Sequence, residues 1–291
     1  MTTPTPLYAP RRLDVTTVER ALQAWEAGFP RPLVDLSRLA RFDPFGLLVL
    51  VLLGQRCREA GGRLRVLLPE NARTRDRLAA SGLFAYLEGA CWTDTPLPDG
   101  VTAEPGLATA RVRDEGDVRP IVDGIGERLE TRFPFGEKAN RLLVGAVIEL
   151  LQNIPHHAAL PGTEGDPFGL ACLEESPDHL HLAIADKGIG LASSLGLNPR
   201  FRGITPAQAL EATLVDGASR FALPGRGGAL RRIREAVVAS AGRFYVRSAG
   251  GAFLQEDVEW SVGNVAPFPG VQISIRLPRT LFERGAEADG G

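Results

Sequence analysis

Hydrophobic and polar positions along the first third of the chain predict short strands and helices in turn. Asp43 and Pro44 precede a long apolar run that ends before Gly61. Asp43 can accept hydrogen bonds from the free amides of a helix start, Pro44 suits the first helical position, and Gly61 suits the left-handed residue that ends a helix. The pattern predicts a strand over 32–37, a helix over 44–60, a strand over 63–69 and a helix over 72–80. This order is typical of a small α/β layer.

A segment of different composition separates this part from the rest of the chain. Residues 91–117 are rich in Pro, Gly, Asp and Thr and show little periodicity, which is typical of a domain boundary. We therefore predict a first domain over 1–98, a linker over 99–117, a second domain over 118–280 and a disordered tail over 281–291.

The second domain has a different order of elements. In one of its apolar segments, Leu180, Leu182 and Ile184 alternate with less apolar residues, so one face of that strand should pack on helices. The pattern predicts helices over 121–130 and 137–155, a hairpin of strands 168–174 and 179–186, a glycine-punctuated stretch to 228, a helix over 229–240 and strands over 243–247, 253–260 and 271–277. We predict an α+β sandwich with helices on one face of a mixed sheet.

Composition excludes several classes of protein. With 44% hydrophobic and 23% charged residues the chain is globular, and its net charge of -2 provides no bulk field for nucleic acid or an anionic membrane. The three cysteines, Cys57, Cys91 and Cys172, lie far apart and form no C-x-x-C pair, so neither a disulfide framework nor a zinc knuckle is expected. The start of the chain has no apolar signal-peptide core, and the longest apolar stretch, 45–54, is about half of what a membrane span needs. We expect a cytoplasmic protein with buried cysteines.

Glu149 and Asn153 form the first candidate site. They are four residues apart in a predicted helix and therefore lie on the same face, one turn from each other. A hydrated Mg²⁺ takes one or two oxygen ligands from protein, so Asn153 could bind the metal while Glu149 polarises an attacking water or hydroxyl. The alternative is an ordinary solvated helix face.

Two glycine-containing motifs form further candidates. Asp186 ends a predicted strand and is followed by Gly188 and Gly190; its carboxylate could accept from the N6 amine of adenine, and the glycines would let the backbone approach the base. The second motif, residues 224–230, leads into a helix whose free amides and positive dipole end would accept phosphates. It contributes the candidate residues Gly225, Arg226, Gly227 and Gly228. The alternatives are a simple turn and a flexible loop.

Taken in this order, the three motifs resemble those of the GHKL superfamily of ATP-binding proteins, which share the Bergerat fold. The resemblance covers about half the chain, from near Val118 to near Pro278. It implies that ATP and Mg²⁺ are cofactors, that Asn153 holds Mg²⁺, that Glu149 is the catalytic carboxylate and that Asp186 binds adenine. It also implies that residues 191–224 form a lid over the nucleotide.

The chain departs from the family pattern at three places. Pro155 should kink or end the helix that carries Glu149. The second glycine motif reads G-R-G-G-A-L in place of G-x-G-x-G, and Gly270 is followed by Val271 where many relatives have threonine. With these departures, the resemblance supports nucleotide binding better than it supports ATP turnover.

The first domain resembles a STAS domain of the anti-sigma-factor antagonist type. The matching segments are 33–37, the helix entry Asp43 to Gly46, the strand that follows Gly61, and 79–83. Antagonists of this family carry a phosphorylatable serine before the glycine, and this chain has Phe45 there. A phenyl ring has no hydroxyl, so phosphorylation of this position is not expected.

Other candidates find less support. The four histidines, His156, His157, His179 and His181, could suggest a metal site. His156 and His157 are adjacent and would point apart on a helix, and no cysteine or carboxylate cluster completes a set of ligands. His157 matches a histidine of the family's first motif. Arg220 and Arg226 could contact phosphate or be surface residues.

We therefore expect a regulator that combines STAS-like and GHKL-like domains and resembles an anti-sigma-factor serine/threonine kinase joined to its own antagonist. It would act on a sigma or anti-sigma type of protein or on a STAS protein, by phosphoryl transfer to Ser/Thr or by ATP hydrolysis. The chain could also form a homodimer. The alternative function is a nucleotide-sensing scaffold without catalysis.

Overall fold

The computed structural model describes residues 8–98, 107–132, 137–156, 168–220 and 228–279. The chain divides into two compact units, 1–109 and 110–291, and both mix helices with sheets. The predicted mixed α/β class is confirmed. Within the described ranges, no helix combines the length and apolar character needed to cross a bilayer. The predicted tail over 281–291 lies outside the described residues.

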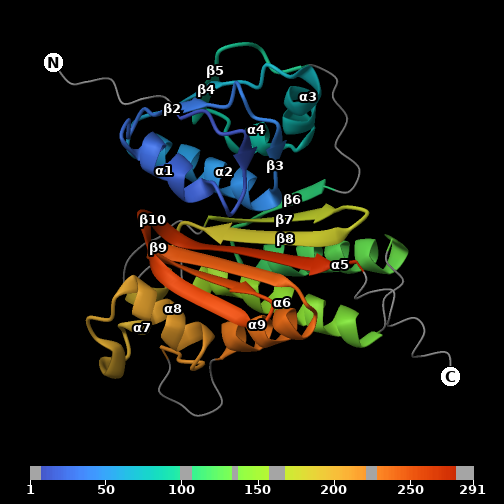
Figure 1. Cartoon of the computed structure of the whole chain (residues 1–291), viewed down its shortest axis with the longest axis vertical. Helices are drawn as coiled ribbons and strands as arrows, with labels where there is room; N and C mark the ends of the chain where they lie inside the picture. Colours follow the sequence, from blue (N-terminus) through green and yellow to red (C-terminus); the bar gives the residue numbers. More distant parts are fainter. Residues whose placement is uncertain (1–7, 99–106, 133–136, 157–167, 221–227, 280–291) are drawn as a thin grey trace. The chain divides into compact units, whose positions relative to one another are not determined.

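The first unit is built around a three-stranded parallel sheet in the order β2-β4-β5, beside a parallel pair β1-β3 (Figure 1). Its elements are β1 (Arg12–Leu13), α1 (Val18–Glu26), β2 (Leu33–Asp35), β3 (Arg41–Phe42), α2 (Pro44–Glu59), β4 (Leu64–Leu67), α3 (Ala72–Ala80), α4 (Leu83–Tyr86) and β5 (Cys91–Thr93). The strands and helices predicted for 32–80 are confirmed.

Helix α2 begins and ends where the sequence predicted. The Asp43 carboxylate accepts a hydrogen bond of 2.8 Å from the Gly46 amide, and Pro44 occupies the first turn. Gly61, with φ +71°, follows the last turn. Phe45 is fully buried and belongs to the core of this unit.

The second unit contains a five-stranded sheet in the order β6-β7-β8-β10-β9, whose pairs β7-β8, β8-β10 and β10-β9 are antiparallel. Its elements are β6 (Leu107–Val112), α5 (Glu115–Arg132), α6 (Glu137–His156), β7 (Gly169–Glu175), β8 (His179–Asp186), α7 (Gly190–Leu195), the 3-10 helix η1 (Pro199–Phe201), α8 (Pro206–Leu214), α9 (Ala229–Ala239), β9 (Arg243–Glu256) and β10 (Glu259–Pro278). Strand β6 and the start of α5 lie inside the segment predicted as a linker.

Helices α5, α6 and α9 lie along one face of this sheet (Figure 1). The core between them includes Val147 and Leu151 from α6, Leu210 from α8, Ile184 from β8 and Val246 from β9, all of which are buried. The alternating leucines of β8 belong to the same core, as the strand pattern predicted. The opposite face of the sheet therefore carries the residues between them.

The last part of the sheet differs from the prediction. The sequence predicts three strands after α9, but the structure has two long ones, β9 and β10. They pair along their length, from Arg243 opposite Arg276 to Glu256 opposite Glu259. The predicted strand 253–260 crosses the turn between them, where Asp257 has φ 49°. A left-handed residue at Ala249 and register shifts between Asn264 and Val271 interrupt the alternation from which strands are inferred.

The predicted lid, residues 191–224, is not an irregular loop in its described part, 191–220. It contains α7 from its second residue on, η1 and α8. Thr205 and Gln208 form a capping box at the start of α8, where Pro206 occupies the first turn, and the buried Leu210 and Leu214 join the core. The residues of this cap and Pro206 are local signals in the sequence for the start of α8. The frequent glycines on both sides nevertheless led to the prediction of a loop.

Candidate functional site

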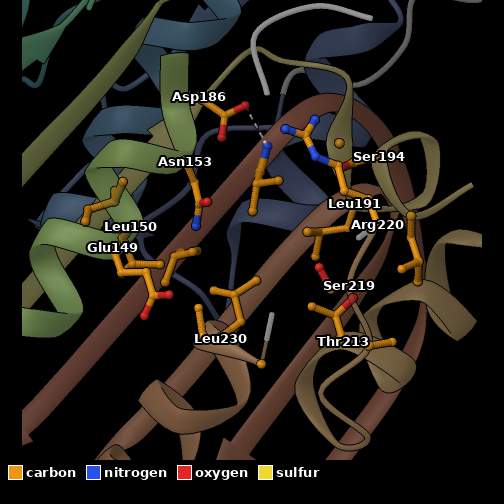
Figure 2. Close-up of a pocket in the computed structure, with 18 of the residues that line it drawn as sticks. Glu149, Leu150, Asn153, Asp186, Leu191, Ser194, Thr213, Ser219, Arg220 and Leu230 are labelled. Atoms are coloured by element: carbon orange, nitrogen blue, oxygen red, sulfur yellow. Dashed lines mark hydrogen bonds between the residues drawn. The ribbon is translucent and has the colours of Figure 1, made fainter. Parts of the chain in front are cut away.

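A cavity of about 400 Å³ lies in the second unit, bordered by α6, the end of β8, α7, α8, the start of α9 and β10 (Figure 2). Segments of the chain that are far apart in sequence meet there. The lining residues are Glu149, Leu150, Asn153, Ile184, Asp186, Gly190, Leu191, Ser194, Leu195, Thr213, Ala218, Ser219, Arg220, Gly228, Ala229, Leu230, Arg232, Val271 and Ile273. The predicted residues Glu149, Asn153, Asp186, Gly190 and Gly228 are thus brought to one place.

Helix α6 supplies Glu149 and Asn153. The sequence predicted that they share one face, and both line the cavity, with their side chains drawn on the same helix in Figure 2. Pro155 lies in the last turn of α6, which ends one residue later at His156. The proline therefore lies inside the helix as described, after the two candidate residues, and their one-turn spacing is intact.

Glu149 is held by an ion pair. Both carboxylate oxygens accept from Nη2 of Arg232 on α9, at 3.2 and 3.3 Å. The two side chains are 38% and 62% exposed, so the pair is screened by water and contributes little to stability. The guanidinium thus engages both oxygens of the carboxylate that the sequence indicates as a base.

Asp186 lies at the end of β8 and is fixed by two backbone amides. Its Oδ1 accepts from Gly188 N at 2.7 Å and from Val271 N at 3.3 Å (dashed line in Figure 2). Burial raises the pKa of Asp186 to about 7, and the two amides act against this by stabilising the carboxylate. An acidic group is thereby kept near its ionisation point at the cavity wall.

Gly270 is required beside this carboxyl group. Its φ is +79°, and a Cβ atom there would lie 1.9 Å from the carbonyl oxygen of Asp186. The backbone of β10 therefore approaches β8 more closely than any residue with a side chain allows.

A buried polar network lies behind the same strands. Nε2 of Gln272 donates to the carbonyl oxygens of Asp186, at 3.1 Å, and Pro269, at 2.7 Å. Its Oε1 accepts from Nη1 of Arg247 at 3.1 Å, and Arg247 also donates to Ala266 O at 2.7 Å. Both side chains are fully buried. No sequence motif indicated this network, which links residues on both sides of the register shift of β10 to Asp186.

The first glycine motif joins β8 to α7. The Gly188 amide bonds to Asp186 as described, and Gly190 adopts φ +76° at the start of α7. The hydroxyl of Ser248 on β9 accepts from Leu191 N at 2.8 Å and donates to Gly270 O at 3.1 Å. Ser248 therefore ties the beginning of α7 to strands β9 and β10.

The second glycine motif is described only at its end. Gly225, Arg226 and Gly227 lie outside the described residues, whereas Gly228 has φ +76° and directly precedes α9. Gly228 lines the cavity together with the first two residues of the helix. The start of an eleven-residue helix, with its free amides, thus borders the cavity.

Sequence reasoning missed part of the cavity wall. The sequence motifs point to Arg220 but not to Thr213, Ser219 or Arg232, which also line the cavity. Arg232 lies one turn into α9, and a basic residue one turn after a glycine motif is the only local signal for it. Its partner Glu149 is 83 residues away in the sequence, so no spacing rule relates the two.

No protein-family model matches this chain, and no curated protein is significantly similar to it.

Proposed function

We propose that the unit 110–291 binds ATP with Mg²⁺ in this cavity and that the chain is a cytoplasmic signalling regulator acting on a protein partner. The observation that carries the proposal is the meeting of three predicted motifs at one cavity wall. They are the acid–amide pair of α6, the acid that ends β8 and the glycine that precedes α9. These motifs lie in segments about forty residues apart in the sequence. Polar groups from distant segments that meet in one cavity are typical of a ligand-binding site.

The donor types around the cavity fit such a ligand. Asp186 offers a hydrogen-bond acceptor beside a backbone that Gly270 holds close, which suits the N6 amine of a flat base. The start of α9 and the basic Arg220 and Arg232 suit phosphates. Asn153 offers a carboxamide oxygen, one of the hard ligands that Mg²⁺ accepts. Bound Mg²⁺ would neutralise charge on the phosphates.

The enzymatic form of the proposal gives Glu149 the role of general base toward a hydroxyl of the partner or toward water. Its carboxylate would first have to leave Arg232. Triphosphate oxygens near the start of α9 would compete for this guanidinium, because both are anions that bind arginine. Nucleotide binding would then release Glu149 at the place where it is needed.

A second form of the proposal is a nucleotide-sensing scaffold without catalysis. The ion pair between Glu149 and Arg232 favours it, since both oxygens of the candidate base are already engaged by the guanidinium. In this form, nucleotide binding changes a surface that a protein partner recognises. In both forms the partner belongs to the sigma, anti-sigma or STAS class, with a second copy of this chain as an alternative.

One experiment tests the proposal. The full chain is incubated with γ-labelled ATP and Mg²⁺, and nucleotide binding, ADP release and self-labelling are measured together. The variant Glu149→Gln should bind ATP as well as the wild type but lose about 10²–10⁴-fold in turnover, the range for a positioned base. Glu211→Gln is the matched control, because Glu211 is an exposed acid on α8 that does not line the cavity.

The outcomes separate the two forms. Turnover that falls in Glu149→Gln and not in Glu211→Gln supports the enzyme. Binding of ATP without ADP release or labelling supports the scaffold. Failure of the wild-type chain to bind ATP at all would overturn both.

A further inference from the structure

Two histidines of β8 lie on the face of the sheet opposite the helices. Leu180 and Leu182 belong to the core beneath the helices. Because side chains alternate along a strand, His179 and His181 point to the other face. The sequence offered no acidic residue to complete a metal site with them. The antiparallel register supplies one, since Glu174 of β7 pairs directly with His181.

The three side chains come close enough to act together. One ligand atom from each of Glu174, His179 and His181 lies within 4.8 Å of the other two. In a tetrahedral zinc site with Zn–N distances of about 2.0–2.1 Å, neighbouring ligand atoms are about 3.3 Å apart. Glu174 and His179 are half-buried, so rotation of their side chains can close the remaining gap.

Both histidine rings are oriented by serine hydroxyls. Nε2 of His181 lies 2.7 Å from Ser274 Oγ, and Nδ1 of His179 lies 2.7 Å from Ser176 Oγ. A tautomer that donates this nitrogen's proton to the serine carries its lone pair on the other ring nitrogen. Metal-binding histidines in proteins use their second nitrogen in this way.

We propose that Glu174, His179 and His181 bind one divalent transition-metal ion of the Zn²⁺ class. Two imidazoles and a carboxylate match the donor set of zinc sites that keep an open fourth position. Mg²⁺ and Ca²⁺ prefer all-oxygen ligands and should bind here poorly. The site lies on the face of the sheet away from the nucleotide cavity and does not depend on the function proposed for that cavity.

Arg276 provides a signature that a purely structural cluster would lack. Its Nη2 lies 3.2 Å from His179 Nδ1, and an N–H donated to this nitrogen stabilises the tautomer whose proton is on Nε2, the nitrogen that would bind the metal. Arg276 therefore opposes metal binding through this tautomer and also brings a positive charge to the ligand set. This charge should weaken cation binding. Arg276→Gln should therefore strengthen Zn²⁺ binding several-fold. If Arg276 only supported the structure of the cluster, its replacement would leave the Zn²⁺ affinity unchanged or lower it.

The test titrates Zn²⁺ and Co²⁺ into the chelator-treated full chain and measures stoichiometry, affinity and the Co²⁺ spectrum. We expect one ion per chain. Glu174→Gln and His179→Gln, both at half-buried positions, should each abolish most of the affinity, and Ser274→Ala should reduce it by about 10–100-fold, as for a residue that orients a ligand. The double variant of His156 and His157 to glutamine is the control, because it removes the other two of the chain's four histidines.

Folding of each variant is checked by circular dichroism, and the half-buried positions of Glu174 and His179 make native-like spectra the expected result. The proposal is supported if these two variants lose Zn²⁺ while the double variant keeps it. It is overturned if the wild type binds no Zn²⁺, if binding survives His179→Gln, or if Mg²⁺ competes on equal terms. A thiolate band in the Co²⁺ spectrum would also overturn it, because the ion would then be bound by cysteine.

Discussion

Replacing Asp186 with asparagine tests the acidic group at the end of β8. In the wild type, Gly188 N and Val271 N both donate to Oδ1, at 2.7 and 3.3 Å. An asparagine keeps these bonds when its carbonyl oxygen takes the place of Oδ1, which puts its NH₂ group in the place of Oδ2. The variant should therefore fold and present a donor to the cavity where the wild type presents an acceptor.

The expected change in affinity follows from the adenine contact proposed above. A hydrogen bond to a charged acceptor contributes about 1.5–3 kcal/mol, which is about 10- to 150-fold in affinity. Asp186→Asn should weaken adenosine binding by this factor, because the N6 amine then faces another donor. Guanosine should bind the variant better than the wild type, since its O6 carbonyl accepts from the new NH₂ group.

The pH dependence makes the same test sharper. With a pKa raised to about 7 by burial, Asp186 is largely neutral at pH 5.5 and ionised at pH 8. Wild-type affinity for adenosine should fall as the pH falls through 7, by up to about tenfold per pH unit, and the variant should show no such fall. The other charged groups that line the cavity, Glu149, Arg220 and Arg232, are present in both proteins.

Stability should change with pH in the opposite direction. A carboxyl group whose pKa is higher in the folded chain than its ordinary value of 3.8 favours folding at low pH, and this contribution is lost as the pH rises from 3.8 to about 7. At about 1.36 kcal/mol per pH unit, the whole interval corresponds to about 4 kcal/mol at most. Water in the cavity reduces this value, because Asp186 is partly exposed.

The assays are calorimetric titration of adenosine and guanosine at pH 5.5, 7 and 8, and urea unfolding at pH 5 and 8. Adenosine is used because it carries no phosphate that titrates in this range. Between pH 5 and 8 the wild type should lose up to about 2–3 kcal/mol of stability relative to Asp186→Asn. Equal affinity of the wild type for both nucleosides at pH 8 would refute the contact with adenine. Parallel stability curves would refute the raised pKa.

Three further predictions concern other parts of the chain. Asn153→Ala should weaken ATP binding in Mg²⁺ and leave binding in EDTA nearly unchanged, as measured by equilibrium dialysis. Gln152→Ala, at the exposed neighbouring position, should change neither. If Asn153→Ala weakened ATP binding equally with and without Mg²⁺, its amide would not be a metal ligand. Gly270→Ala should destabilise the chain by at least about 2 kcal/mol in urea unfolding, because its Cβ would overlap the Asp186 carbonyl oxygen at a positive φ. Asp43→Ala should cost about 1 kcal/mol through loss of the helix cap, and an unchanged urea midpoint would contradict this.

Local signals predicted much of the secondary structure correctly. The cap of α2 and its glycine stop involve residues within a few positions of one another, and the alternation in β8 identified its core face. The one-turn spacing of Glu149 and Asn153 is likewise a property of any helix. Such features depend on short-range geometry, which the sequence alone carries.

The predictions from the sequence were wrong where pairing between distant segments changes the local pattern of apolar and polar residues. The division of β9 and β10 was mistaken because left-handed residues and register shifts break the alternation of a continuous ladder. Helix α8 was missed among frequent glycines, although its cap at Thr205 is a local signal. In that stretch the burial of Leu210 in the core confirms a helix that periodicity did not indicate.

The sequence by itself determined which residue types the candidate sites contain, and the tertiary structure decided which of them meet. The sequence places Asp186 at a strand end, but only the packing of β10 against β8 shows that Gly270 and the Val271 amide hold it. Likewise, only the strand register brings Glu174 beside His181. The physical reason is that spacing along a strand or helix is fixed by backbone geometry, whereas contacts between distant segments depend on the packing and register of the whole sheet.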